Sequence, residues 1–318
     1  MKTAVLLMAY GGPGSLEDVE PYLLDVRGGR QTSDELVAEI RARYAHIGGL
    51  SPLLDITRQQ AGALETVLNS SSAGDYKVFV GMRHWHPYIN DTVREIHAAG
   101  FKRLVALCMT PFASRMSTGA YAEKLNDALR AVDPAGSIDV KVVEYWFDNP
   151  RYISAIAGLV RSGVAKFPPE VQSCVPVLFT AHSLPAAIIN QGDPYDAQYR
   201  RSAAAIAAAA GLADDRWQVG YQSAGATNGR WLGPSLEEML EALARKGEQF
   251  ALAAPVGFVS DHVEILYDID VEARETAARL GIHLERIDAP NISPPFIAAL
   301  ADIVLSAVGH NGNTNTSR

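Results

Sequence analysis

Two side chains at the ends of apolar segments have the chemistry to bind a metal ion or move a proton. His182 follows the apolar segment 175–181, and Glu264 comes shortly after the apolar segment 250–257. A neutral imidazole can ligate a metal or accept a proton near pH 7, because its unperturbed pKa is about 6.5. The alternatives are structural: a histidine hydrogen-bonded to a neighbouring loop, and a Glu264 that closes a capping box with Asp261.

A row of carboxylates continues from Glu264. Glu264, Asp268 and Glu272 are spaced four residues apart, which places them along one face of a helix. Hard oxygen ligands leading toward a histidine at a strand end suit a path for a divalent cation. A solvated acidic helix face is the alternative.

Further candidates follow the first two apolar segments. Tyr10 is followed by the loop GGPG at 11–14, which matches neither G-x-G-x-x-G nor a P-loop and has no following lysine. We therefore expect Gly11 to allow a sharp turn rather than to bind a nucleotide. His84 follows the second segment, and His86, two residues later, is expected at the surface.

A basic cluster lies beyond the first loop. It comprises Arg27, Arg30, Arg41 and Arg43, with Tyr44 and Ser51 after it. Arginine binds carboxylates through two parallel hydrogen bonds, so the cluster suits an acidic ligand. A solvated charge balanced by nearby glutamates explains Arg41 more readily than Arg43.

Eight apolar segments alternate with helical patterns and position these residues. This alternation predicts an α/β fold with two doubly wound halves, each containing a parallel sheet of four strands. The expected strands are 4–9, 77–82, 103–110, 139–146, 175–181, 217–222, 250–257 and 282–287. Ligands of open α/β sheets lie beyond the carboxyl ends of the strands, so we expect the candidate residues to face a cleft between the halves.

The chain is expected to divide near Asp148. We predict an N-terminal domain at 1–148, a C-terminal domain at 149–308 and a flexible tail at 309–318. The helix expected at 296–308 is a candidate to pack back on the first domain.

Composition restricts the class of partner. The 318 residues include 28 basic and 36 acidic side chains, a formal charge of −8 with no basic stripe, which argues against nucleic acid and anionic membranes. We see neither a signal peptide nor a membrane span, and expect a cytoplasmic protein. Cys108 and Cys174 lie in apolar segments and are expected to be buried; two cysteines cannot supply four thiolates to an iron–sulfur cluster.

Six segments together resemble the ferrochelatase family, in order from about residue 3 to 308. They are AYGGP (9–13), IGGLSPL (47–53), GMRH (81–84) with Pro87, FTAHSLP (179–185), QS (222–223) with WLGP (231–234), and PVGFVSDHVEILYDID (255–270). The resemblance implies the chelatase fold, with two similar Rossmann-like domains that clamp a tetrapyrrole, and a lyase that inserts ferrous iron into a porphyrin.

The resemblance also implies roles for individual residues. His182 and Glu264 match the family's metal-binding and proton-accepting pair, while Asp268 and Glu272 match an acidic face proposed to relay metal or protons. Two residues match cleft positions of less defined role, His84 and Trp231.

Tyrosine at position 10 resembles the coproporphyrin III ferrochelatases of Gram-positive bacteria, in which this residue approaches the iron from the face opposite the histidine. Six positions match their porphyrin and propionate contacts: Tyr10, Arg27, Arg43, Tyr44, Ser51 and Tyr121. Gly28 and Gly29 stand where relatives often have another arginine, and Arg30 is our candidate substitute.

These implications define the expected chemistry. Ferrous iron and porphyrin are substrates, no cofactor is permanently bound, and no [2Fe–2S] cluster is expected. We expect a monomer with no integral membrane anchor and transient contacts with neighbouring haem-pathway enzymes. The rival functions are a protoporphyrin IX ferrochelatase and a non-catalytic haem or metal carrier.

Overall fold

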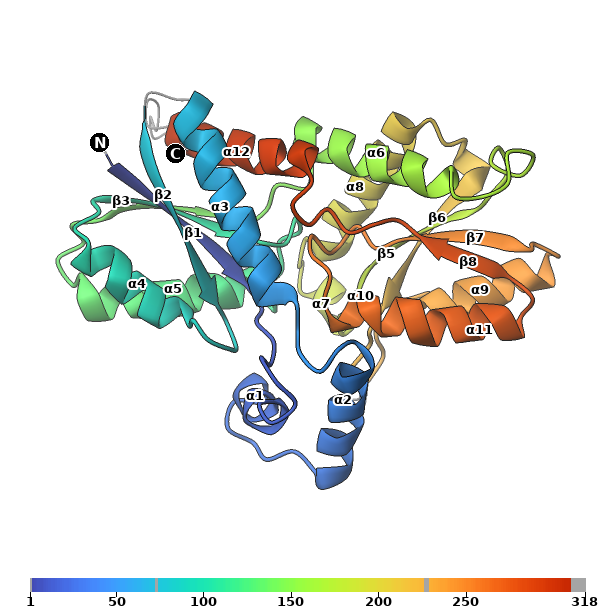
Figure 1. The fold of residues 1–318 in the computed structure, drawn as a ribbon, viewed down its shortest axis with the longest axis horizontal. Helices are drawn as coiled ribbons and strands as arrows, with labels where there is room; N and C mark the ends of the chain where they lie inside the picture. Colours follow the sequence, from blue (N-terminus) through green and yellow to red (C-terminus); the bar gives the residue numbers. More distant parts are fainter. Residues whose placement is uncertain (1, 72–73, 226–228, 310–318) are drawn as a thin grey trace.

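A computed structural model describes residues 2–71, 74–225 and 229–309 of the chain. Within these residues the strands form two parallel four-stranded sheets, ordered β2-β1-β3-β4 and β6-β5-β7-β8, which confirms the predicted fold class (Figure 1). The strands are β1 Lys2–Ala9, β2 Asp75–Met82, β3 Arg103–Cys108, β4 Asp139–Val143, β5 Val177–His182, β6 Trp217–Gln222, β7 Phe250–Ala254 and β8 His283–Arg286. Except for Gly309, the tail expected to be flexible lies outside the described residues.

Helices connect and cover the strands. They are α1 Val19–Val26, α2 Asp34–His46, α3 Leu53–Ser71, α4 Ile89–Ala98, α5 Thr118–Val132, α6 Pro150–Val164, α7 Ala187–Asn190, α8 Tyr195–Ala210, the 3₁₀ helix Asp214–Arg216, α9 Leu236–Arg245, α10 Val263–Leu266, the π-helix Asp268–Ala273, α11 Arg274–Arg279 and α12 Pro294–Gly309. A capping box begins α9, with Ser235 and Glu238 each bonding the other's backbone N–H.

Each sheet is buried on both faces, as parallel sheets are. In the first half, from β1 to β4, α3 and α12 cover one face and α4 and α5 the other (Figure 1). In the second half, from β5 to β8, α6 and α8 cover one face, and α9, the π-helix and α11 the other. In Figure 1, β1, which leads to Tyr10, runs toward the region between the halves.

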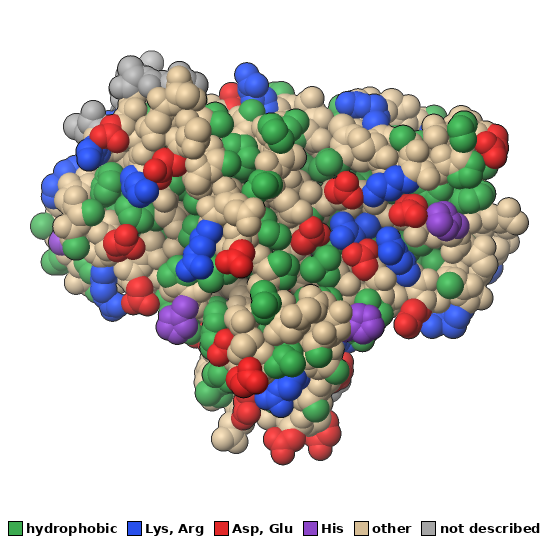
Figure 2. All heavy atoms as spheres, in the orientation of Figure 1, with side chains coloured by type: hydrophobic (Ala, Val, Ile, Leu, Met, Phe, Trp, Pro, Cys, Tyr) green, Lys and Arg blue, Asp and Glu red, His purple; other side chains and the backbone are tan. Residues whose placement is uncertain are grey.

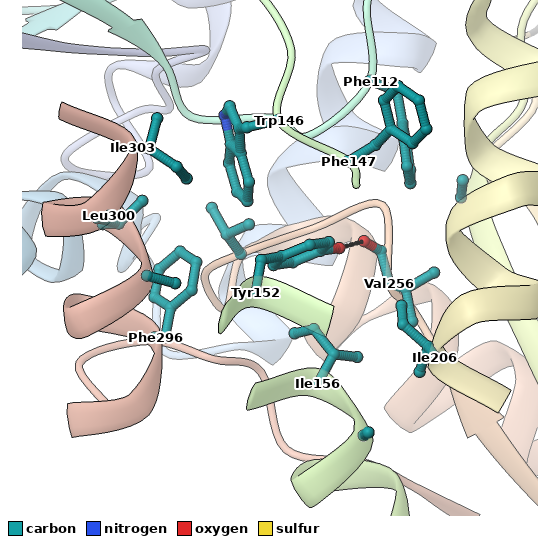
Figure 3. Close-up of a cluster of buried hydrophobic side chains, with 14 of the residues drawn as sticks. Phe112, Trp146, Phe147, Tyr152, Ile156, Ile206, Val256, Phe296, Leu300 and Ile303 are labelled. Atoms are coloured by element: carbon teal, nitrogen blue, oxygen red, sulfur yellow. Dashed lines mark hydrogen bonds between the residues drawn. The ribbon is translucent and has the colours of Figure 1, made fainter. Parts of the chain in front are cut away.

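One hydrophobic core joins the two halves along the side formed by α3, α12, α6 and α8. In Figure 3, Trp146 points toward Tyr152 of α6 and Phe296 of α12, whose ring centroids lie 4.9 and 6.2 Å from its own, and Phe147 lies beside Phe112. The Trp146 Nε1–H donates to the carbonyl of Cys108 at 2.9 Å, and the Tyr152 hydroxyl donates to the carbonyl of Val256 at 2.9 Å. The fourth strand was expected to reach residue 146 but ends at Val143, because Trp146 turns into this core instead of continuing the ladder.

The two cysteines differ in exposure. Cys108 is buried in β3, whereas Cys174 is exposed, so the prediction of two buried thiols is wrong for Cys174. The strand that was expected to begin at residue 175 begins at Val177, which leaves Cys174 in a surface turn.

The helix pair α1 and α2 projects from the body of the molecule (Figure 1). Acidic and basic side chains are interspersed over the face shown in Figure 2, and no basic stripe crosses it. Within the described part of the chain, no helix has the length and apolar character needed to span a membrane.

Candidate active site

His182 is the last residue of β5, and its ring is oriented by the backbone. The Nδ1 atom contacts the carbonyl of Ser183, which can only accept, so Nδ1 carries the hydrogen. In the neutral ring the lone pair is therefore on Nε2, which lies 3.7 Å from Oε1 of Glu264. Both side chains are partly exposed. The structure thus brings the two principal sequence candidates together.

Glu264 is not part of a capping box with Asp261. The helix α10 starts after His262, and the backbone N–H of Asp261 donates instead to Oδ1 of Asn291 at 2.9 Å. The Glu264 carboxylate faces two imidazoles, since His262 Nε2 lies 3.4 Å from its Oε2. Desolvation alone would raise the pKa of Glu264, but His182 and His262 lower it to about 2, so the carboxylate is ionised at neutral pH.

Sequence reasoning missed His262. Its Nδ1 donates to the carbonyl of Ser260 at 2.8 Å, which directs Nε2 toward Glu264. Burial alone would lower the pKa of His262, but the hydrogen bond and charge of Glu264 raise it. The available signal was its place two residues before Glu264, in the most specific motif of the chain.

A glycine allows this loop to approach β5. A Cβ at Gly257 would lie 2.8 Å from Cα of Ala181, closer than side chains normally come to backbone. Gly257 therefore allows the loop that leads to Glu264 to lie against the strand that ends in His182.

The acidic row does not lie free in solvent. Asp268 and Glu272 both pair with Arg43 of α2, each at 3.4 Å, and Arg43 also pairs with Glu39 at 3.1 Å. The Ser223 hydroxyl donates to Asp268. Arg43, expected to bind substrate carboxylates, therefore binds protein carboxylates in this structure.

Asp268 has an unusual acidity. Desolvation, together with the charges of Glu264 and Glu272, raises its pKa to about 6, although Ser223 and Arg43 oppose this rise. Asp268 is the first residue of the π-helix. The row of Glu264, Asp268 and Glu272 therefore follows a π-helical turn rather than one regular α-helix.

In the first half, Tyr10 and His84 lie beside each other. The ring centroids of Tyr10 and His84 are 4.8 Å apart, and His84 Nδ1 lies 2.7 Å from Oδ1 of Asp25. Gly11 has φ of +98°, which confirms the predicted sharp turn after Tyr10. His84 is buried, and desolvation lowers its pKa although Asp25 opposes this.

Arg83 is a second residue that sequence reasoning missed. Its guanidinium carbon lies 5.8 Å from the ring centroids of both Tyr10 and Tyr121, so a cation is placed between two tyrosines. Its only sequence signal was its place beside His84 at the end of β2. Tyr121 is buried on α5.

The other expected substrate contacts are distributed around this group. Among the described residues, the buried Nε of Arg27 has no hydrogen-bond partner, while Arg30 donates to the Arg27 carbonyl at 3.0 Å. Tyr44 is buried, and Ser51 packs so closely on Gly12 that a Cβ there would lie 2.5 Å from its Oγ.

Two further sequence expectations concern Trp231, expected in the cleft, and His86, expected at the surface. Trp231 forms a backbone bridge with Pro185, in the loop after His182. His86 is exposed, as expected, and packs against Tyr88 instead of sharing a site with His84.

The pKa values of three tyrosines in the first half depend in part on the charge of Glu264 in the second half. Desolvation by the surrounding protein, followed by the charge of Glu264, raises the pKa of Tyr10 to about 12. Desolvation is also the main cause of the raised pKa of Tyr44 and of Tyr121; the charge of Glu264 is the second cause for Tyr44 and the smallest one for Tyr121. Three tyrosines of the first half therefore lie within the field of a carboxylate from the second half.

The site therefore contains the Nε2 lone pair of His182, the ionised carboxylate of Glu264 and the imidazole of His262. Among the described residues, no three His, Cys, Asp or Glu side chains are grouped to hold a metal ion together. The chemistry available is transient: a cation can be held by one or two protein ligands while a proton passes to His182 or Glu264.

Comparisons with known proteins identify the family of the chain. The family model described as Ferrochelatase matches residues 2–308. A Deinococcus radiodurans protein named Ferrochelatase is 43% identical over 300 residues, covering 94% of each chain. The Bacillus subtilis protein named Coproporphyrin III ferrochelatase is 37% identical over 310 residues, covering 97% of this chain and 98% of that one.

A further relative and a solved structure extend the comparison. A Herpetosiphon aurantiacus protein named Ferrochelatase is 40% identical over 303 residues, covering 95% of this chain and 98% of its own. The solved structure titled SirB from Bacillus subtilis with Fe3+ has a TM-score of 0.57 at 11% identity, covering 96% of each chain, which shows a shared fold. On the match of its sequence over almost its whole length, the chain belongs to the ferrochelatase family.

Proposed function

We propose that this protein inserts ferrous iron into coproporphyrin III, forming iron coproporphyrin III and releasing two protons. The observation that carries the proposal is the Glu264 carboxylate, which lies between the imidazoles of His182 and His262 and faces Tyr10 of the other half. Family membership supports the ferrochelatase reaction. The choice of coproporphyrin III rests on Tyr10 and on the names of the Bacillus relatives.

Metallation needs acceptors for the two pyrrole protons and a ligand for the incoming iron. In the neutral state, Nε2 of His182 has a free lone pair, and Glu264 is ionised, so each can take a proton or hold the metal. Part of the porphyrin binding energy is used to bend the macrocycle and expose its nitrogen lone pairs. The shared core limits relative movement of the two halves, so we place the adaptation in α1 and α2.

The carboxylates of the porphyrin are proposed to bind on the first half. The buried Nε of Arg27 has no hydrogen-bond partner among the described residues and is proposed as a donor, and Tyr44, Ser51 and Tyr121 are proposed to supply hydroxyls. Arg43 joins them by exchanging Asp268 and Glu272 for a substrate carboxylate. Coproporphyrin III has four propionates and protoporphyrin IX two, so this many donors suits the former.

Tyr10 is proposed as the ligand of the product iron on the face opposite His182. Its pKa of about 12 keeps the phenol protonated before the reaction. An iron cation bound nearby would offset the charge of Glu264 and favour the phenolate.

The remaining parts of the proposal concern cofactors and partners. Iron is a substrate, no cofactor is permanently bound, and no [2Fe–2S] cluster is used. We propose a cytoplasmic monomer that contacts neighbouring haem-pathway enzymes transiently.

One anaerobic assay tests the function. Purified protein is mixed with ferrous iron and either coproporphyrin III or protoporphyrin IX, and porphyrin fluorescence is followed. We expect consumption of coproporphyrin III with a kcat/KM higher than for protoporphyrin IX. A preference for protoporphyrin IX would identify the other ferrochelatase subtype, and binding without consumption of either porphyrin would identify a carrier.

A further inference from the structure

The loop that precedes Glu264 is held by a residue from the other half of the molecule. Gln60 lies on α3 and is completely buried, with 0% of its surface exposed. Its amide nitrogen is within hydrogen-bond distance of three acceptors: the carbonyl of Val259 at 3.1 Å, Oγ of Ser260 at 3.0 Å and the carbonyl of Asn291 at 3.0 Å. An amide nitrogen has two hydrogens, so one of these contacts is shared. The three acceptors lie 199, 200 and 231 positions along the chain from Gln60.

Ser260, which Gln60 contacts, in turn orients His262. The carbonyl of Ser260 accepts the Nδ1–H of His262 at 2.8 Å, and this bond aims Nε2 of His262 at Glu264. A displacement of Ser260 therefore turns His262 and moves one of the two imidazoles away from the carboxylate.

A second connection supports the same loop. The Asn291 side chain accepts from the backbone N–H of Asp261 at 2.9 Å and donates to the Asp261 carboxylate at 2.7 Å. Asn291 precedes α12, which packs against α3, so Gln60 and Asn291 belong to one frame around the loop. Asn291 has φ of +43°, a conformation that persists where neighbouring contacts determine it.

Only one end of the Gln60 amide makes these contacts. Among the described residues, its Oε1 has no hydrogen-bond partner. Replacement by glutamate would keep the shape of the side chain but would replace the donating nitrogen by an oxygen, opposite two carbonyls that can only accept.

We propose that Gln60 is a positioning residue for catalysis, through which the first half sets the geometry of the His262 and Glu264 pair. This inference rests on the proposed function, because it assigns Gln60 a role in the metal insertion step. Porphyrin contacts are proposed on other residues of the first half, so Gln60 acts on kcat and leaves porphyrin binding unchanged.

The test compares two neighbouring, chemically identical substitutions. Gln60→Glu is expected to lower kcat roughly tenfold or more, because displacement of reacting groups by about 1 Å is costly. The KM for coproporphyrin III should stay within about twofold. Gln59→Glu is the matched control, because Gln59 is exposed on the same helix turn, and it should behave as wild type. Assays are run well below the unfolding midpoint of each variant.

Three results would overturn the proposal. They are a kcat within about twofold of wild type in Gln60→Glu, a rise in KM that accounts for its loss of kcat/KM, or an equal loss of activity in Gln59→Glu. If Gln60→Glu does not yield folded protein, Gln60→Met is used under the same criteria, since it keeps the length and removes the donors without adding charge.

The two proposals fail in different ways. If wild type inserts no iron into either porphyrin, the proposed function fails, and the role of Gln60 is read from crystal structures of the two variants. A distance from His262 Nε2 to Glu264 that increases in Gln60→Glu but not in Gln59→Glu supports the positioning role. An unchanged distance overturns it.

Discussion

Arg43 of α2 and Asp268 of the π-helix form an ion pair, with Nη1 and Oδ1 3.4 Å apart, that connects the first half to the second. The same guanidinium contacts Glu272 and lies 5.1 Å from the centroid of the Tyr267 ring. A residue proposed to bind substrate and two residues proposed to relay cations or protons are thus one network. Porphyrin that recruits Arg43 would leave Asp268 and Glu272 without their cation.

Asp268→Asn should make stability less sensitive to pH. The folded pKa is about 6 and the ordinary value is 3.8, so the folded state binds this proton more tightly. Asp268 therefore stabilises the fold below pH 4 and loses that contribution as pH rises through about 6. Above pH 6 it lowers the free energy of unfolding by up to about 3 kcal/mol relative to an unperturbed group, and asparagine removes this penalty.

Thermal unfolding measured at pH 5 and pH 7.5 tests this sign. The stability gained by Asp268→Asn should be larger at pH 7.5 than at pH 5. Asp127→Asn is the control, because Asp127 is exposed on α5, and it should show no such difference. A stability difference between Asp268→Asn and wild type that does not increase from pH 5 to pH 7.5 would contradict the raised pKa.

His182→Ala should abolish metal insertion. The substitution removes the Nε2 lone pair that faces Glu264, and loss of a proton acceptor or metal ligand costs roughly 10²-fold to 10⁴-fold in rate. Porphyrin affinity, measured by fluorescence quenching, should change little. His283→Ala, at an exposed histidine on β8, is the control. Normal turnover in His182→Ala would remove His182 from the mechanism.

Glu264→Gln should lower kcat by roughly 10²-fold while weakening porphyrin binding much less. The amide has nearly the same shape, but it removes the charge that pairs with His182 and His262. Steady-state kinetics and a thermal melt are measured on the same preparation. A changed melting temperature with unchanged kcat would assign Glu264 a structural role only.

Tyr10→Met should change the absorption spectrum of the enzyme with bound iron coproporphyrin and speed release of this product. The reason is loss of the proposed oxygen ligand opposite His182, at a ring that packs 4.8 Å from His84. Stopped-flow transfer of product to excess apomyoglobin measures the release rate. Tyr145→Met, at an exposed tyrosine, is the control. An identical spectrum in Tyr10→Met would exclude ligation by Tyr10.

The fold and the strand-end residues could be predicted from local pattern. Eight apolar segments produce eight parallel strands, and the four inner ones, β1, β3, β5 and β7, are buried, because a strand covered on both faces needs a continuous apolar run. Candidates at the carboxyl ends, such as Tyr10, His84 and His182, follow from this, since parallel strands present those ends at one edge of a sheet.

The environment of each side chain required the tertiary structure. The capping box proposed for Glu264 is locally possible, yet Asn291, 30 residues beyond Asp261, takes the backbone N–H of Asp261 and leaves Glu264 to two imidazoles. Arg43 resembles a solvated helix charge until the π-helix, 225 positions away, supplies its partners.

The sequence by itself determined the strands, the sheet edges and the identity of the chemical groups, because backbone pairing and burial depend on short-range apolar pattern. The tertiary structure alone decided which charges face one another, that His262 and Arg83 belong to the site, and that Gln60 supports it. Those relationships arise between segments far apart in the chain, and their electrostatic effect depends on distance and desolvation, which no local pattern encodes.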